Sequence, residues 1–592
     1  MNTKTDSDGI RWDLSDLYDS ALDPRLERDL AETLKRAQAL AERCRGRLAA
    51  LTAAELRELL VEYEQIAELA GKAGAYAFLS WSTDTEDPAR GKLLQTVTEH
   101  SSRLQQALVF LELEWAQLPE EQASALIEHN DLSGYRHWLT LARRYRPHLL
   151  SEPEEKILAE KAVTGKSAWK RYFDEVMGAS RYELEGKLLP QQSVLSRLHD
   201  PDRETRRRAA EALTEGLAGL ERTTVFTFNN ILADKSSEDR LRSYPTWISA
   251  RNLDNQIDDV TVEALIKAVT SRYGTVARYY RLKRELLKLP ELFDYDRYAP
   301  LPATGRSYTW AEARSRVLEA YEDFHPRLAA SARDFFEKRW IDAAVQPGKR
   351  GGAYSHGTVP SVHPYVFLNF QGTPRDVMTL AHELGHGVHQ SLAARQGYLQ
   401  AGTPLTTAET ASVFGEMLVF HRLMEREKNP RARLALLVQK IEDVFATVFR
   451  QVAMNRFEDA IHNARRRGGE LDAPGFASLW METQKAMYAD SVTLTEDYRL
   501  WWSYIPHFIH TPGYVYAYAF GQLLVLALYA RYEEGRRDFP GLYLDMLAAG
   551  GSDWPERIVA PLGVDLKDPR FWEKGLNMID ELVSQAEALA AE

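Results

Sequence analysis

The chain is poor in cysteine: Cys44 is the only one among 592 residues. A single thiol excludes an intrachain disulfide, and it also excludes a metal site built from several thiolates. Histidine and carboxylate side chains are therefore the ligands available to a metal ion. Nothing beside Cys44 marks it as an activated thiol, so we expect it to be a helix residue without a special role.

Long apolar runs and an excess of positive charge are also missing. No apolar stretch reaches the length of about 18 residues that a bilayer span requires, and the first residues are polar. The net charge of -12 and the pI near 5.8 provide no field that attracts phosphate backbones or anionic lipids. We expect no nucleic-acid partner, no membrane association and a cytoplasmic location, while nothing in the sequence specifies an oligomeric state.

What the sequence does contain is helical periodicity, with enough apolar residues (44%) for a large core. Apolar residues recur at helical spacing through residues 24–149, and again, with interruptions, from about 200 to 340. Residues 182–190 alternate and contain turn formers, which predicts a small hairpin. The sequence therefore predicts a mainly α fold, with an N-terminal helical region (1–190) and a second region (191–592) that contains the motif described next.

Thr373-Pro374-Arg375-Asp376 has the features of a helix start, with a hydroxyl N-cap, a proline at the first position and an acid three residues after the cap. The helix that follows carries His382-Glu383-Leu384-Gly385-His386. Two histidines four residues apart lie on one face, about 6 Å apart along the axis, and can converge on one zinc ion. Glu383 then faces the open side of the metal, where it can take a proton from zinc-bound water.

A third ligand must come from another segment, and Glu409 is the first candidate. Its spacing from Thr406 equally fits a capping box, in which the glutamate would bind the backbone at a helix start. Glu416 is two turns further on and could accept a hydrogen bond from a ligand imidazole, although a solvated helix glutamate is commoner. His389 is expected in the core or behind the ligands, because a catalytic zinc keeps one position open for water.

A second cluster of polar aromatic residues lies near the C-terminus. His507 and His510 are followed by Tyr514, Tyr516 and Tyr518 at every second position. These side chains could donate hydrogen bonds to a developing oxyanion or to a substrate carbonyl. They could equally be core aromatics that the Pro512-Gly513 turn brings together.

These segments resemble the thimet oligopeptidase and oligoendopeptidase F group of zinc peptidases, and most closely the oligoendopeptidase F branch. The resemblance covers nearly the whole chain. Its segments are Trp12–Tyr18, Gly348–Tyr354, His382–His389, Pro506–Phe508 and the tyrosine repeat up to Tyr518.

The resemblance implies that Glu409 is the third zinc ligand and that Glu416 supports a ligand from behind. It also implies that His507 and two tyrosines, Tyr514 and Tyr518, bind substrate and steady the tetrahedral intermediate. Tyr516 could replace either tyrosine, because the spacing around Pro512-Gly513 departs from the pattern of the branch, and His510 is a further candidate for substrate contact.

The fold that the resemblance implies has two helical lobes around a deep substrate channel, with a small β-sheet next to the zinc helix. Residues 365–370 fit the strand of that sheet that faces the substrate, which would bring Tyr365 and Phe367 close to an extended peptide. Such a channel admits unfolded oligopeptides and rejects folded proteins.

The sequence therefore predicts a peptidase with one Zn²⁺ per chain that cleaves internal bonds of short unfolded oligopeptides; two histidines and a glutamate favour zinc over magnesium or calcium. A dipeptidyl carboxypeptidase of similar architecture is the alternative within the enzymes. A zinc aminopeptidase is disfavoured, because the Gly-x-Met-Glu-Asn segment usual in those enzymes is missing. A helical peptide-binding scaffold with structural zinc is the alternative from another class, and Glu383 argues against it, since a structural site needs no general base.

Overall fold

The computed structural model of the protein describes residues 7–301 and 307–592. Most of these residues are helical, as predicted, and the strands form only small sheets of two and three strands. The chain divides into two units, and each unit is assembled from three separate segments. Unit 1 contains Met1–Arg146, Arg306–Arg426 and Arg531–Asp565, and unit 2 contains Pro147–Gly305, Glu427–Ala530 and Leu566–Glu592.

The division predicted at residue 190 does not coincide with these units. It falls at the end of a strand inside unit 2, and the nearest unit boundary lies between Arg146 and Pro147. The hairpin predicted over 182–190 is confirmed as an antiparallel pair of strands, in which Glu185 and Gly186 form the turn with positive φ angles.

Unit 1 contains the predicted metal motif among the following helices and strands. They are α1 (Pro24–Cys44), α2 (Ala53–Thr83), α3 (Pro88–Leu108), α4 (Phe110–Gln117), α5 (Glu120–Glu128), α6 (Arg136–Arg144), α14 (Trp310–Phe324), α15 (Pro326–Glu337), β3 (Ile341–Asp342), β4 (Tyr354–His356), β5 (Tyr365–Phe367), α16 (Pro374–Ala393), α17 (Leu405–Ala408), α18 (Thr410–Arg426), α24 (Phe539–Ala549) and α25 (Pro555–Val559).

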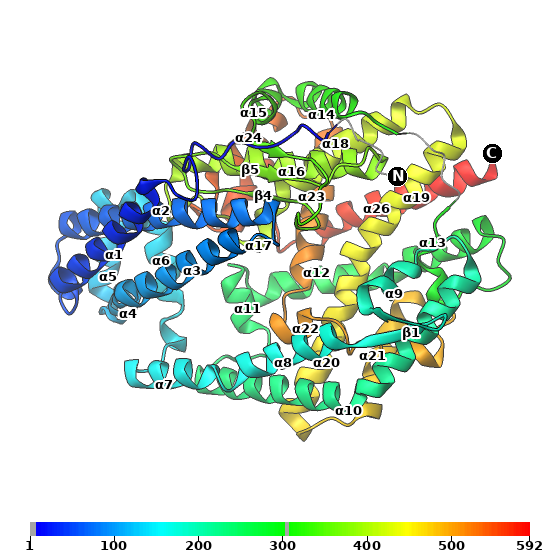
Figure 1. The fold of residues 1–592 in the computed structure, drawn as a ribbon, viewed down its shortest axis with the longest axis horizontal. Helices are drawn as coiled ribbons and strands as arrows, with labels where there is room; N and C mark the ends of the chain where they lie inside the picture. The colour runs from blue at the N-terminus through cyan, green and yellow to red at the C-terminus, as the bar shows by residue number, and fades with distance from the viewer. Residues whose placement is uncertain (1–6, 302–306) are drawn as a thin grey trace. The chain divides into compact units, whose positions relative to one another are not determined.

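Helices α1, α2 and α3 run side by side in unit 1, and α16 lies along α18 (Figure 1). The three-stranded sheet has the order β3-β5-β4 and packs against α16, which confirms the small sheet expected beside the motif helix. The late segment of unit 1 returns to this centre, because Tyr543 of α24 donates its hydroxyl to the carbonyl oxygen of Thr410 at 2.7 Å. Its ring stacks on Phe414 with centroids 4.4 Å apart.

The N-terminal segment packs on the same sheet. The ring of Trp12 lies 5.8 Å from that of Tyr365 and 5.7 Å from that of Phe367. The Tyr365 hydroxyl donates to the carbonyl oxygen of Asp13 at 2.8 Å. Both strand residues are fully buried, so this face of the sheet belongs to the core of unit 1.

Unit 2 is built mainly of helices that surround an aromatic core. Its elements are α7 (Glu152–Ala162), α8 (Lys166–Ala179), β1 (Arg181–Leu184), β2 (Lys187–Pro190), α9 (Gln191–Arg197), α10 (Arg203–Leu241), α11 (Ser249–Asp254), α12 (Asp259–Ser271), α13 (Tyr273–Leu286), α19 (Pro430–Thr447), α20 (Phe449–Gly468), α21 (Ala473–Tyr488), α22 (His507–His510), α23 (Tyr516–Glu533), whose last residues pass into unit 1, and α26 (Pro569–Ala591).

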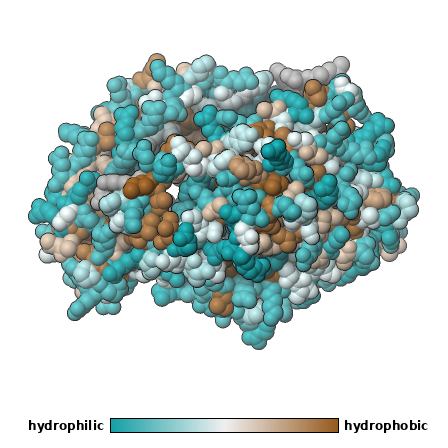
Figure 2. Space-filling view, turned by 90° about the horizontal axis from the view of Figure 1, so that it is seen from below, coloured by the Kyte–Doolittle hydropathy of each residue, from teal (hydrophilic) through white to brown (hydrophobic). Residues whose placement is uncertain are grey.

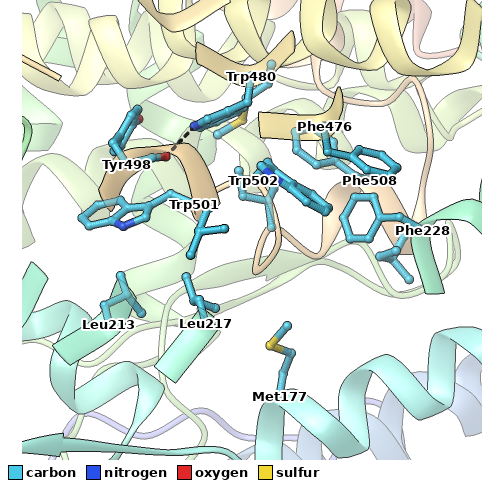
Figure 3. Close-up of a cluster of buried hydrophobic side chains, with 14 of the residues drawn as sticks. Met177, Leu213, Leu217, Phe228, Phe476, Trp480, Tyr498, Trp501, Trp502 and Phe508 are labelled. Carbon is cyan, nitrogen blue, oxygen red and sulfur yellow. Dashed lines mark hydrogen bonds between the residues drawn. The ribbon is translucent and has the colours of Figure 1, made fainter. Parts of the chain in front are cut away.

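Large aromatic side chains fill the core of unit 2, as Figure 3 shows. Trp502 stacks on Phe476 at 4.5 Å and meets Phe228 edge to face at 4.7 Å. The indole nitrogen of Trp480 donates to the carbonyl oxygen of Tyr498 at 3.0 Å, which satisfies a polar group that is buried in this core.

Across the described residues, no helix combines the length and the apolar character that a membrane span requires. On the face shown in Figure 2, hydrophilic residues predominate and hydrophobic residues occur in smaller groups between them.

Candidate metal centre

The motif helix α16 starts as its sequence predicts. Thr373 is the N-cap, its hydroxyl accepts a hydrogen bond from the backbone N–H of Asp376, and the Asp376 carboxylate accepts one from the backbone N–H of Thr373. Pro374 occupies the first turn. This reciprocal cap satisfies backbone donors that the helix start would otherwise leave unpaired, and it fixes where the later turns of α16 lie.

Two glycines let neighbouring elements come close to α16. A Cβ atom added at Gly385 would lie 2.4 Å from the carbonyl oxygen of Ala411 and 2.6 Å from Cα of Ser412, both on α18. One added at Gly387 would lie 2.6 Å from the Phe335 ring. Gly385, between the two motif histidines, therefore sets the short distance between α16 and α18.

We expect Gly385→Ala to separate α16 from α18 and to weaken metal binding. Crowding of this kind typically costs about 1–3 kcal/mol, because the added methyl group meets backbone that cannot rotate away. Gly74→Ala in α2 is the matched control: apart from its own helix backbone, its added Cβ has no described heavy atom within 4 Å, and alanine favours a helix interior by about 0.5–1 kcal/mol. Thermal unfolding and zinc titration check both variants, and a Gly385→Ala protein with the stability and zinc affinity of the wild type would contradict the expectation.

Three side chains from α16 and the α17–α18 junction converge on one point. Oε2 of Glu409 lies 3.4 Å from Nε2 of His382 and 3.4 Å from Nε2 of His386. One ligand atom from each of the three residues lies within 4.8 Å of the others, and the two imidazole rings are nearly perpendicular at 81°. Each side chain keeps between 19 and 32% of its surface exposed, so the group has an accessible side.

Glu409 does not occupy the capping-box position that its spacing also allowed. Glu409 is the C-cap of α17, directly before α18, and Thr406 lies inside α17 instead of at an N-cap. Ser412 donates its hydroxyl to Oε2 of Glu409 at 2.6 Å. This contact orients the carboxylate toward the two rings, where it can serve as a ligand.

Glu416 lies behind the first histidine. Its Oε2 is 3.3 Å from Nδ1 of His382, while Nε2 of the same ring points to Glu409. Burial alone would lower the pKa of His382, but the hydrogen bond to Glu416 and the charges of Glu409 and Glu416 raise it to about 9. A carboxylate behind a ligand imidazole fixes the orientation of the ring and makes it a stronger ligand.

The charge balance of the group suits a cation. Burial would raise the pKa of Glu409, but the hydrogen bond to His386 and the charges of both histidines lower it to about 2. Two imidazole nitrogens and one carboxylate oxygen, with an accessible side, are the donor set of a catalytic zinc site with three protein ligands. The residues present therefore fit the metal that the motif predicts.

Glu383 lies between the metal group and the sheet. Its side chain is buried, with 7% of the residue exposed, and it accepts a hydrogen bond from the backbone N–H of Ser355 on β4. Burial raises the pKa of Glu383, and the two motif histidines oppose this shift. The carboxylate is thus held at the side of the metal group that faces β4.

The expectation that residues 365–370 form the strand facing the substrate is wrong. β5 is the central strand, with β3 parallel on one edge and β4 antiparallel on the other, so its backbone groups are already paired. Tyr365 and Phe367 are fully buried against the N-terminal segment. In the described part of the chain β4 pairs only with β5, so β4 is the strand with a free edge beside Glu383.

His389 takes the core position that was one of its predicted alternatives. It is buried, and burial, with a smaller contribution from the charge of His386, lowers its pKa to about 3. A neutral, buried imidazole is consistent with a packing role, and His389 lies outside the group of three residues that can hold a metal.

His507, Tyr514 and Tyr518 form one cluster in unit 2. Nε2 of His507 lies 3.3 Å from the Tyr518 hydroxyl oxygen, and the His507 ring stacks on Tyr514 with centroids 6.1 Å apart. The two tyrosine rings meet edge to face at 5.0 Å. Burial lowers the pKa of His507, and the charges of Arg450 and His510 lower it further, so the ring is neutral at neutral pH and offers one N–H donor.

Tyr516 and His510 have other roles in the structure. Tyr516 is fully buried, and its hydroxyl oxygen accepts a hydrogen bond from the Asn255 side chain at 2.9 Å. Nε2 of His510 lies 2.8 Å from the Asp174 carboxylate on α8. Both residues anchor the segment that carries His507, so the tyrosines with partly exposed side chains are Tyr514 and Tyr518.

Sequence reasoning missed three supporting residues: Ser355, Ser412 and Tyr321. Tyr321 of α14 donates its hydroxyl to the carbonyl oxygen of Ala381, directly before the first histidine, at 2.6 Å. Ser412 could have been found, because a serine three residues after a carboxylate can reach it within a helical turn. Ser355 and Tyr321 are distant in sequence from their partners and carry no local signal.

Comparison with known proteins identifies the class of the chain. Residues 196–578 match the model of Peptidase family M3, and residues 114–182 match a model described as Oligopeptidase F. The first match alone covers more than half of the chain, which makes the protein a peptidase. The chain belongs to peptidase family M3, and the resemblance to the oligoendopeptidase F branch is confirmed.

Relatives and solved structures agree with this assignment. The chain is 28% identical to Oligopeptidase PepF of Bacillus subtilis over 92% of this chain and 82% of the relative. It is 26% identical to a plasmid-encoded Oligoendopeptidase F of Lactococcus lactis over 98% and 97% of the two chains. The crystal structure of oligoendopeptidase-F from Enterococcus faecium has the same fold, with a TM-score of 0.72, 22% identity and coverage of 95% of this chain and 98% of that chain.

Proposed function

We propose that the protein is a zinc-dependent endopeptidase that hydrolyses internal bonds of short, unfolded oligopeptides. The observation that carries this proposal is the convergence of His382, His386 and Glu409, with Glu383 buried beside them. These three ligands would hold one Zn²⁺ per chain. A reducing compartment such as the cytoplasm suits a chain with a single buried cysteine, and we propose that the enzyme acts there.

When bound, zinc lowers the pKa of a water molecule and polarises the carbonyl group of the scissile bond. Glu383 acts as the general base: it takes a proton from the attacking water and passes it to the nitrogen of the leaving amine. The Ser355 N–H holds the Glu383 carboxylate on the side toward β4. Glu416 keeps the ring of His382 oriented.

The free edge of β4 is the proposed binding site for the peptide backbone. On this edge an extended substrate can donate a backbone N–H to the carbonyl oxygen of Ser355, which gives affinity without strong demands on the substrate's side chains. Because Ser355 lies in the middle of this strand and also contacts Glu383, a peptide on this edge has its backbone next to the general base.

His507, Tyr514 and Tyr518 are the proposed donors to the oxygen of the scissile carbonyl. Their mutual contacts support this role, because a neutral imidazole and two phenols gathered within one short segment of unit 2 offer several donors. The role itself follows the family resemblance.

Product analysis of a peptide of about ten residues tests the proposal, the length being matched to an extended-strand site. We expect internal cleavage when both peptide ends are blocked, and loss of cleavage when zinc is removed with a chelator and its return when zinc is restored. Trimming of the unblocked peptide alone would replace the proposal with an exopeptidase such as a dipeptidyl carboxypeptidase. No cleavage of either peptide by the zinc-loaded protein would leave a peptide-binding scaffold.

A further inference from the structure

The segment from His507 to Tyr518 is fixed at both ends. At its start, Phe508 enters the aromatic core of unit 2 (Figure 3), with its ring 5.3 Å from Phe457 and 6.4 Å from Phe228. At its end, the buried hydroxyl of Tyr516 is held by Asn255. Between these anchors lies the Thr511-Pro512-Gly513 turn, which leads directly into Tyr514.

The turn has an anchor of its own, which comes from α20. The backbone N–H of Gly513 donates to Oε1 of Glu458 at 2.8 Å. Gly513 has a φ angle of 76°, which favours glycine, and an added Cβ would meet Trp247, Ile248 and Arg251 at 3.4 Å. The turn therefore lies between α20 and residues 247–251, which lead into α11 and form its start.

Glu458 is a buried acid, and among the described residues its side chain accepts a hydrogen bond from Gly513 alone. Its exposed fraction is 0%, and among the described residues Oε2 has no hydrogen-bond partner. Burial raises the pKa of Glu458 to about 8, although the Gly513 N–H and the charges of Arg251 and Lys235 oppose this shift. A buried oxygen without a hydrogen-bond partner lowers the stability of the folded protein. An acid at this position therefore needs an explanation other than stability.

The layer around Glu458 is rigid. His462, one turn further along α20, stacks flat on Trp247 with centroids 4.6 Å apart and an interplanar angle of 9°. The indole nitrogen of Trp247 donates to Asp459 at 2.8 Å. These contacts fix Trp247, against which Gly513 packs, so the acceptor and the surface beneath the turn are both held by α20.

We propose that Glu458 is a positioning residue that fixes Tyr514 relative to His507 by holding the N–H of Gly513. The proposal rests on the proposed function, since it concerns the segment assigned to the substrate's carbonyl oxygen. Without this bond, a glycine with its wide conformational freedom would connect the turn to Tyr514. A displacement of about 1 Å of a group that contacts the transition state can lower the rate about 100-fold.

Three variants separate positioning from general stability. Glu458→Gln keeps a carbonyl acceptor for Gly513, Glu458→Met removes it at similar length, and Glu458→Asp withdraws it while the carboxylate is kept. Asn229→Leu is the matched control: Asn229 is also buried and accepts the backbone N–H of Leu471 at 3.0 Å, but it holds a different loop of unit 2.

We expect Glu458→Met and Glu458→Asp to lower kcat about 10- to 100-fold with little change in KM, because the defect acts on the transition state. Glu458→Gln should restore kcat to within about threefold of the wild type, and Asn229→Leu should lower Tm without lowering kcat. Equal losses of kcat in Asn229→Leu and Glu458→Met, or full activity in Glu458→Met and Glu458→Asp, would overturn the proposal.

Amide hydrogen exchange gives a readout that does not depend on catalysis. We expect faster exchange at residues 513–518 in Glu458→Met and Glu458→Asp, and unchanged exchange there in Glu458→Gln and Asn229→Leu. If the wild type cleaves no peptide, the proposed function fails while this exchange pattern still tests the anchor. Unchanged exchange at these residues in both Glu458→Met and Glu458→Asp would refute the anchor itself.

Discussion

Replacing Glu383 with glutamine is expected to lower kcat by roughly 10²–10⁴-fold, the contribution usual for a general base, while zinc remains bound. The amide has nearly the shape of the carboxylate but cannot take a proton from water. The three proposed ligands are untouched by this change, so zinc content measured by mass spectrometry should equal that of the wild type. Steady-state kinetics with a blocked peptide measure the loss.

A graded variant separates chemistry from packing. Glu383→Asp keeps a carboxylate but shortens its reach by one methylene group, and we expect a kcat between those of Glu383→Gln and the wild type. The Ser355 N–H would then lose part of its acceptor, so a small loss of stability should accompany this variant. Wild-type cleavage by Glu383→Gln would show that Glu383 is not the base.

Removal of Glu409 is expected to abolish metal binding and, with it, cleavage. Loss of a residue that only hydrogen-bonds a metal ligand typically weakens metal affinity by roughly 10- to 100-fold. Glu409→Ala removes a proposed ligand itself, so its loss of zinc affinity should be larger. Glu416→Gln, which changes such a partner of His382, should fall within that range. Competition with a zinc chelator of known affinity measures both variants.

Glu425→Ala is the matched control for the Glu409 variant, because Glu425 is an exposed glutamate of α18. It should retain the zinc affinity of the wild type. An unchanged affinity in Glu409→Ala would remove Glu409 from the ligand set, and an equal loss in Glu409→Ala and Glu416→Gln would contradict their distinct roles.

Local signals explain what the sequence could predict. The cap at Thr373, the proline after it and the spacing of His382 and His386 all act within one helix, so α16 and its ligand face follow from neighbouring residues. The turn at Glu185-Gly186 is equally local, and the hairpin was predicted for that reason.

Contacts between distant segments explain the rest. A short apolar run looks the same whether it is a central or an edge strand, and only the pairing of β5 with both β3 and β4 decides this. The spacing of Glu409 from Thr406 fits both a metal ligand and a helix cap, and only the start of α17 at Leu405, which places Thr406 inside the helix, excludes the cap. The sequence does not distinguish the role of Tyr516 from those of Tyr514 and Tyr518, because its hydrogen-bond partner, Asn255, lies 261 residues earlier.

The interleaving of the two units affects the synthesis of the protein. The chain leaves the ribosome from its N-terminus, but unit 1 is incomplete until residues 531–565 have been made, and unit 2 until 566–592 have followed. Tyr543, which donates a hydrogen bond to the Thr410 carbonyl next to Glu409, emerges after His382, His386 and Glu409. A nascent chain that already contains the three proposed metal ligands thus still lacks this support until residues 531–565 have been made.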